Sequence, residues 1–118
     1  MATVTPTKSH PNENTDLILL TWEGFATNGD VGSPFGAPAY SDKTVHVKGN
    51  FGTGGTIVVE GSNDGVTYKT LTDPQGNALS FTAEGIELIS ESPLYIRPRL
   101  SAGTSTIDID VFIVGRRH

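Results

Sequence analysis

The sequence predicts an all-β protein, an antiparallel β-sandwich or a jelly-roll-like small barrel with an extended N-terminal arm. About seven or eight short segments have strand periodicity, and turn-forming residues separate them at intervals of roughly 8 to 15 residues. The composition, with 14 Gly, 7 Pro and 36% hydrophobic residues, disfavours a helical bundle, which needs long runs of strong helix formers. A length of 118 residues allows one domain with a thin core.

The charge balance narrows the partners that we expect. The formal net charge of −5 argues against nucleic acid as a partner, because phosphate binding requires clustered cations.

The longest apolar run, Leu17 to Leu20, is too short for a membrane span, so no membrane partner is expected. The first residues lack the pattern of a secretory signal, which predicts synthesis in a cytoplasm. The absence of Cys excludes disulfides and zinc-thiolate sites and leaves the compartment open.

The N-terminal segment differs from the rest of the chain. Residues 1–16 contain Thr5, Pro6, His10 and Pro11 but no period that could bury a face, so we interpret them as an extended arm. The remainder, residues 17–118, is expected to form a single β-sandwich domain. Such an arm either stays mobile or becomes ordered against a partner, which makes its residues candidates for partner binding.

A long loop is expected early in this domain. The segment from residue 17 to 22 is apolar enough for a strand buried on both faces, with Trp22 in the core. Residues 24–42 then form a Gly- and Pro-rich stretch of a length that usually indicates a functional or interaction segment. Its aromatic residues Phe25, Phe35 and Tyr40 indicate that the segment packs on its own domain or on a neighbour, and they are candidate anchors for a partner.

The next strands are expected to include a hairpin. Strand patterns cover residues 43–48, 57–60, 79–82, 86–90, 95–100 and 106–115. Asp64-Gly65 is typical of a two-residue turn with positive φ at both positions. In that register Glu60 stands opposite Lys69, a charge-complementary pair across the hairpin.

The last two predicted strands carry a second set of opposite charges. A turn at Gly103-Thr104 would place Arg97 opposite Asp110 and Arg99 opposite Asp108. This pairing favours structural ion pairs over calcium binding or acid–base catalysis by the two aspartates. Pro98 lacks an N–H donor, so its strand is expected to lie at an edge or to carry a bulge.

No catalytic or metal-binding pattern stands out. The histidines are His10 in the arm, His46 on the polar side of a strand, and His118 at the terminus, and none belongs to a common metal or hydrolase motif. The glycines from Gly49 to Gly55 lead into a strand rather than a helix, unlike a phosphate-binding loop. The sequence therefore predicts a non-enzyme without cofactor or metal.

Residues 60–117 resemble the small auxiliary head proteins of tailed bacteriophages, the decoration or cement proteins. The similarity consists of the Ser62–Gly65 hairpin followed by Tyr68, the loop at residues 73–77, the strand from Tyr95 to Arg99 and the final alternating strand. The resemblance implies a virion protein on the capsid exterior that binds the major capsid protein. It also implies a homotrimer that clamps adjacent capsomers and so stabilises the particle.

The residues leave two other functions open. A phage tail or spike module would use equally short strands, and an adhesion-type carbohydrate-binding module also fits an acidic, Gly-rich sandwich. For the decoration role, our hypothesis is that residues 1–16 and 24–42 dock onto the capsid or onto neighbouring subunits. Deletion of residues 1–16 tests this hypothesis through particle binding and thermal uncoating.

Overall fold

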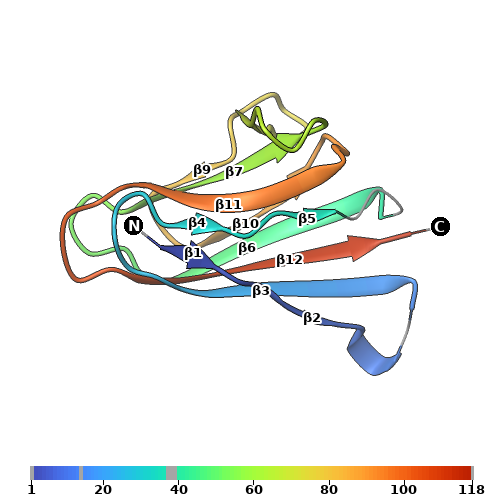
Figure 1. The fold of residues 1–118 in the computed structure, drawn as a ribbon, viewed down its shortest axis with the longest axis horizontal. Helices are drawn as coiled ribbons and strands as arrows, with labels where there is room; N and C mark the ends of the chain where they lie inside the picture. Colours follow the sequence, from blue (N-terminus) through green and yellow to red (C-terminus); the bar gives the residue numbers. More distant parts are fainter. Residues whose placement is uncertain (1, 14, 37–39, 118) are drawn as a thin grey trace.

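The computed structural model describes residues 2–13, 15–36 and 40–117, which form two β-sheets packed face to face (Figure 1). This arrangement confirms the predicted all-β class and selects the sandwich. The helical structure in the described residues is one 3-10 turn, η1 (Pro11–Glu13). The described residues include no helix that could span a membrane.

One sheet has five antiparallel strands. Their spatial order is β10 (Gly85–Ile89), β6 (Asp42–Asn50), β12 (Asp108–Arg116), β3 (Leu17–Phe25) and β2 (Thr7–Ser9). Alternate residues of β6 and β12 are buried, as the sequence period predicts. This sheet therefore has one face in the core and one face towards solvent.

The other sheet has seven strands. β11 (Tyr95–Ala102) lies between β7 (Thr56–Ser62) on one side and the short strands β4 (Val31–Gly32) and β5 (Phe35–Gly36) on the other. β8 (Lys69–Thr70) and β9 (Ser80–Phe81) pair with β7, and β1 (Thr3–Val4) runs parallel to β4. Strands β4 and β5 come from the segment predicted to be one long loop.

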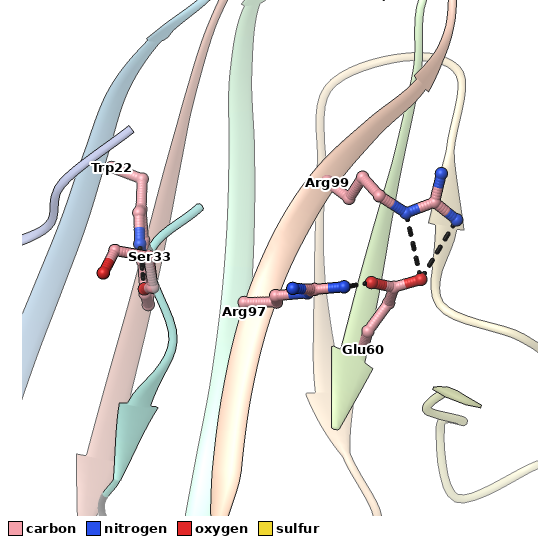
Figure 2. A network of polar contacts seen from close by, with 5 residues as sticks. All are labelled: Trp22, Ser33, Glu60, Arg97 and Arg99. Atoms are coloured by element: carbon pink, nitrogen blue, oxygen red, sulfur yellow. Dashed lines mark hydrogen bonds and ion pairs between the residues drawn. The ribbon is translucent and has the colours of Figure 1, made fainter. Parts of the chain in front are cut away.

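The core between the sheets is closed around Trp22, which is fully buried as predicted. Its indole Nε1 donates a hydrogen bond to the carbonyl oxygen of Ser33 at 3.0 Å (Figure 2). Gly32 passes close to this ring, since a Cβ at that position would lie 2.9 Å from the indole and 2.7 Å from Pro98 Cδ. The close approach explains why a glycine occupies β4.

The N-terminal segment is built into both sheets. β1 pairs with β4 in one sheet, and β2 pairs with β3 in the other. The carboxylate of Asp30 accepts hydrogen bonds from the backbone N–H groups of Ala2, Ala26 and Thr27 at 2.8 to 3.1 Å. The segment is extended, but it is ordered by its own domain because backbone pairing replaces the buried face that its sequence lacks.

Pro98 lies in an interior strand, so of the two predicted alternatives, an edge position or a bulge in its strand, the edge position is wrong. Val59 of β7 stands opposite Pro98, and its backbone hydrogen bonds point away from β11. The Val59 N–H donates to the Leu79 carbonyl, and the Val59 carbonyl accepts from the Leu71 N–H. On its other side, Pro98 falls between the residues of β11 that pair with β5 and with β4. The missing donor therefore leaves no ladder hydrogen bond unmade. β11 does carry a register shift, between Leu100 and Ala102.

The hairpin after β7 is displaced by one residue from the predicted register. Glu60 faces Thr70, and Lys69 faces Gly61. The Asp64 side chain accepts the N–H groups of Val66 and Thr67, which widens the turn beyond two residues. Because side chains alternate along a strand, this shift puts Lys69 on the opposite face of the sheet from Glu60.

Candidate interaction surface

The outer face of the seven-stranded sheet carries a cluster of charged and aromatic side chains, which we call the Arg–Tyr face. It consists of Glu60 on β7, Tyr95, Arg97 and Arg99 on β11, and Tyr68 just before β8. The alternation of β7 and β11 directs these residues outwards, while Ile57, Val59, Ile96 and Leu100 point into the core.

Glu60 holds both arginines of this face (Figure 2). Its Oε1 accepts a hydrogen bond from Arg97 Nε at 3.1 Å, and its Oε2 accepts one from Arg99 Nε at 3.0 Å. The Glu60 side chain is only 7% exposed, whereas those of Arg97 and Arg99 are 23% and 37% exposed. The buried carboxylate thus fixes two partly exposed arginine side chains, and the trio has a net charge of about +1.

The predicted partners of these arginines are wrong. β11 and β12 belong to different sheets, so Arg97 and Arg99 cannot face Asp110 and Asp108. Asp110 stands opposite Lys48 and accepts the Gly24 N–H at 3.1 Å, and Asp108 is exposed. The turn predicted at Gly103-Thr104 is instead a connection between the two sheets. The predicted Glu60–Lys69 pair is replaced by the two arginine pairs on Glu60.

The two tyrosines are held by their neighbours. The guanidinium carbon of Arg97 lies 3.7 Å from the centre of the Tyr68 ring, which is a cation–π contact. A Cβ at position 65 would lie 3.4 Å from the Tyr95 ring, so the hairpin after β7 rests against this ring. Tyr68 and Tyr95 are both half-buried, and each ring keeps part of its surface accessible.

The hairpin is fixed by side-chain hydrogen bonds to its backbone. Besides accepting from Val66 and Thr67, Asp64 Oδ1 accepts the hydroxyl of Ser62 at 2.7 Å. The backbone hydrogen bonds from Thr67 and Val66 hold the pKa of Asp64 well below its usual value. The loop that supports Tyr95 is therefore ordered before any partner binds.

A shallow groove of about 390 Å³ lies between this hairpin and the segment before β11. Lys69 and Glu91 line it with the backbone of Gly61 and Ser62. Glu91 Oε1 accepts the Thr72 N–H at 2.8 Å. Burial raises the pKa of Glu91, but the hydrogen bonds from Thr72 outweigh burial and lower it overall.

The predicted aromatic anchors have different positions from those expected. Phe25 is fully buried at the end of β3, so it packs on its own domain and its prediction as a partner anchor is wrong. Phe35 and Tyr40 are half-buried and pack against the domain's own core. Sequence reasoning assigned all three to a loop because Gly24 follows the apolar run, whereas Gly24 adopts a φ of +88° within β3 and the strand continues.

The arm residues lie at the surface of their own domain. Thr5 is exposed and Pro6 half-buried, between β1 and β2. His10 Nδ1 lies 2.7 Å from the Leu17 carbonyl, and Pro11 begins η1. A role for these four residues in partner binding stays a prediction.

Metal ligation has no visible basis in the part of the chain described. Across residues 2–13, 15–36 and 40–117, no three His, Asp or Glu side chains come together in a group that could hold a metal ion. His46 lies against Phe112, with ring centroids 5.7 Å apart, on the solvent side of the five-stranded sheet. His118 lies outside the described residues.

No protein-family model and no curated protein matches this sequence. Among solved structures, the chain is similar to the crystal structure of the SPBc2 prophage-derived protein YomS, with a TM-score of 0.63 and 14% sequence identity. The alignment covers 86% of this chain and 96% of that one. At this identity, the likeness shows a shared sandwich fold.

Proposed function

We propose that this chain is a structural protein of a tailed-phage particle that decorates the outer surface of the capsid. The observation that carries the proposal is the Arg–Tyr face. Arg and Tyr are enriched at protein–protein interfaces, and here both are fixed in place before binding. Because these side chains are already ordered, binding to this face would cost less conformational entropy than binding to a face of mobile side chains.

The fold and the resemblance support the same proposal. The sequence of residues 60–117 resembles phage decoration proteins, and the sandwich is shared with a prophage-derived protein. The two partly exposed arginines favour a partner surface that presents carboxylates, since Arg binds carboxylates in a planar, two-point geometry. The major capsid protein is the proposed partner.

Co-sedimentation with expanded, undecorated heads tests this proposal. We expect the chain to pellet with the heads to a saturating stoichiometry and to raise the temperature at which they release DNA. A chain that stays in the supernatant at micromolar concentration would contradict the decoration role.

A carbohydrate-binding module is the second candidate, and the two half-exposed tyrosines on one face favour it. Sugar rings stack on aromatic faces, but one face of Tyr68 is already covered by Arg97. Binding to a panel of acidic and neutral glycans, without binding to heads, would support this alternative.

A further inference from the structure

The outer face of the five-stranded sheet carries apolar side chains on β10, β12 and β3, and the exposed Thr44 and His46 of β6 lie between those of β10 and β12. Here Ile86 and Leu88 of the edge strand β10 are 62% and 46% exposed, and Phe112 and Val114 of β12 are half-buried. Leu19 of β3 lies in the same row as Val114 and Leu88. We call these five residues the apolar face. No described strand or helix of the chain packs over them as a further layer.

Opposite charges flank the apolar face along the strand direction. At one end, Lys48 of β6 stands directly opposite Asp110 of β12 in the strand register. At the other end, Asp42 of β6 stands directly opposite Arg116 of β12. β6 thus carries Lys48 at the first end of the face and Asp42 at the second, whereas β12 carries Asp110 at the first end and Arg116 at the second.

We propose that the apolar face binds a second copy of this chain as a two-fold symmetric dimer, in place of the homotrimer that the resemblance implies. The two-fold axis crosses the strands over the central row of paired residues, which are Glu87, Val45, Ile113 and Leu20. A copy rotated about this axis places each strand over its own equivalent in the antiparallel direction. The contact is then self-complementary, as a two-fold interface requires.

The charges decide in favour of this occupant. Under the two-fold rotation, Lys48 lies over Asp42 of the copy, and Asp110 lies over Arg116 of the copy. Each contact occurs twice, so four pairs of opposite charge border one dimer. Cross-strand pairing within the chain already places opposite charges side by side on β6 and β12. The reversed order of the two pairs is the additional feature that makes the surface complementary to a rotated copy.

The shape of the face agrees with the same rotation. A groove of about 320 Å³ is lined by Leu88, Val114 and Thr44, with Asp42 and Arg116 also on its walls. The rotation brings Phe112 of the copy over this groove, because positions 112 and 114 exchange. Phe112 is the largest side chain of the apolar face, and on its own chain it contacts His46 and Lys48. The rotation therefore places this ring against the hollow of the other chain.

The size of the face suits a weak to moderate dimer. The four strands β10, β6, β12 and β3, about 4.8 Å apart, and four rows of outward-facing residues, about 6.7 Å apart, give a projected area of roughly 500 Å². Standard interfaces bury about 800 Å² per partner, measured as accessible area, which exceeds projected area. In this dimer the two Arg–Tyr faces point away from each other, so the proposal does not depend on what those faces bind.

Charge exchange between Lys48 and Asp42 tests the dimer. Sedimentation velocity of the full chain should show a monomer–dimer equilibrium that weakens at high salt. Lys48→Asp and Asp42→Lys should each weaken dimerisation about tenfold, because like charges then face each other twice. An equimolar mixture of the two variants should form heterodimers of wild-type affinity, since every facing pair is again of opposite charge.

Apolar variants give a second, independent readout. Ile86→Asp should abolish the dimer, whereas Val66→Asp should leave it unchanged, because Val66 is 82% exposed on the hairpin of the other sheet. Thermal unfolding verifies that each variant is folded. If Asp42→Lys does not fold, the comparison of Ile86→Asp with Val66→Asp still tests the dimer. A monomer at all concentrations, a trimer, or a mixture of charge variants that fails to associate would overturn the proposal. Loss of head binding in Ile86→Asp together with a monomeric wild type would assign the face to the capsid instead.

Discussion

Glu60 and Arg97 are directly paired across β7 and β11, and the Arg97 Nε lies 3.1 Å from Glu60 Oε1. The same carboxylate reaches Arg99, two residues along β11. One buried acid therefore positions the two basic groups of the Arg–Tyr face. The stability and the proposed binding role of this face both depend on Glu60.

Substitution Glu60→Gln should destabilise the fold by about 1–3 kcal/mol. The substitution removes the buried negative charge and leaves two guanidinium groups close together without a carboxylate between them. Both arginines are partly exposed, and solvent screening reduces the loss of stability. Urea denaturation measures this difference. Glu87→Gln on the exposed edge strand is the matched control and should change stability by less than about 0.5 kcal/mol. Equal effects of the two substitutions would mean that the arginine pairs contribute nothing.

Substitution Gly32→Ala should destabilise the core by about 2–3 kcal/mol. Its Cβ would lie within 3 Å of both Trp22 and Pro98, so one strand must shift. The shift should also lengthen the Trp22–Ser33 hydrogen bond, which tryptophan fluorescence can follow. Gly85→Ala is the control, because its Cβ would meet only ordinary contacts with Phe81 at 3.5 Å. A fully stable Gly32→Ala variant would show that β4 can move freely.

Asp30 should make the domain sensitive to acid. Burial raises the pKa of this carboxyl, but hydrogen bonds from Thr27, Ala26 and Ala2 outweigh burial and lower it overall. A lowered folded-state pKa stabilises the protein above the unfolded pKa of about 4, and this contribution disappears as the pH falls through the folded value.

Asp30→Asn should therefore cost about 1–2 kcal/mol at pH 7 and flatten the loss of stability below pH 4. Thermal midpoints measured from pH 7 to pH 2 give the comparison. Asp108→Asn, at an exposed position, should keep the wild-type profile. An Asp30→Asn profile parallel to that of the wild type would contradict the assignment.

Deletion of residues 1–9 should lower the thermal midpoint of the isolated domain by about 5 °C or more. The deletion removes β1 and β2, including the hydrogen bonds that Val31 and Ser33 donate to this segment. A docking role for the arm therefore needs a point substitution. Thr5→Lys changes an exposed residue outside the strands, and an unchanged affinity for heads would argue against a direct contact by the arm.

The local sequence pattern predicts where the strands lie better than it predicts which strands pair with each other. The period of β6 and β12 showed which residues are buried, because alternation depends on adjacent positions only. Opposite charges on consecutive strands suggested a β11–β12 hairpin, but the chain crosses to the other sheet after Ala102. Thr106, a β-branched residue with a φ of +59°, lies in this crossing and gives no sequence signal for it.

The Arg–Tyr face was only partly predictable. The sequence places Glu60, Arg97 and Arg99 on strands as charged residues, yet their mutual contact depends on the pairing of β7 with β11, which lie far apart in sequence. Tyr68 reaches Arg97 because the hairpin is longer than two residues. The N-terminal pairing could not be derived from residues 1–16, since its partners are backbone groups rather than a side-chain pattern.

Head binding by an arginine variant tests the role of the Arg–Tyr face most directly. Arg99→Ala leaves the Glu60–Arg97 pair in place, and Arg117→Ala removes the same charge at a distant, exposed ion pair with Asp16. In co-sedimentation with expanded heads, we predict that Arg99→Ala binds at least tenfold more weakly than the wild type and that Arg117→Ala binds as the wild type does. Equal loss in both variants, or wild-type binding by Arg99→Ala, would contradict the assignment of this face to partner binding.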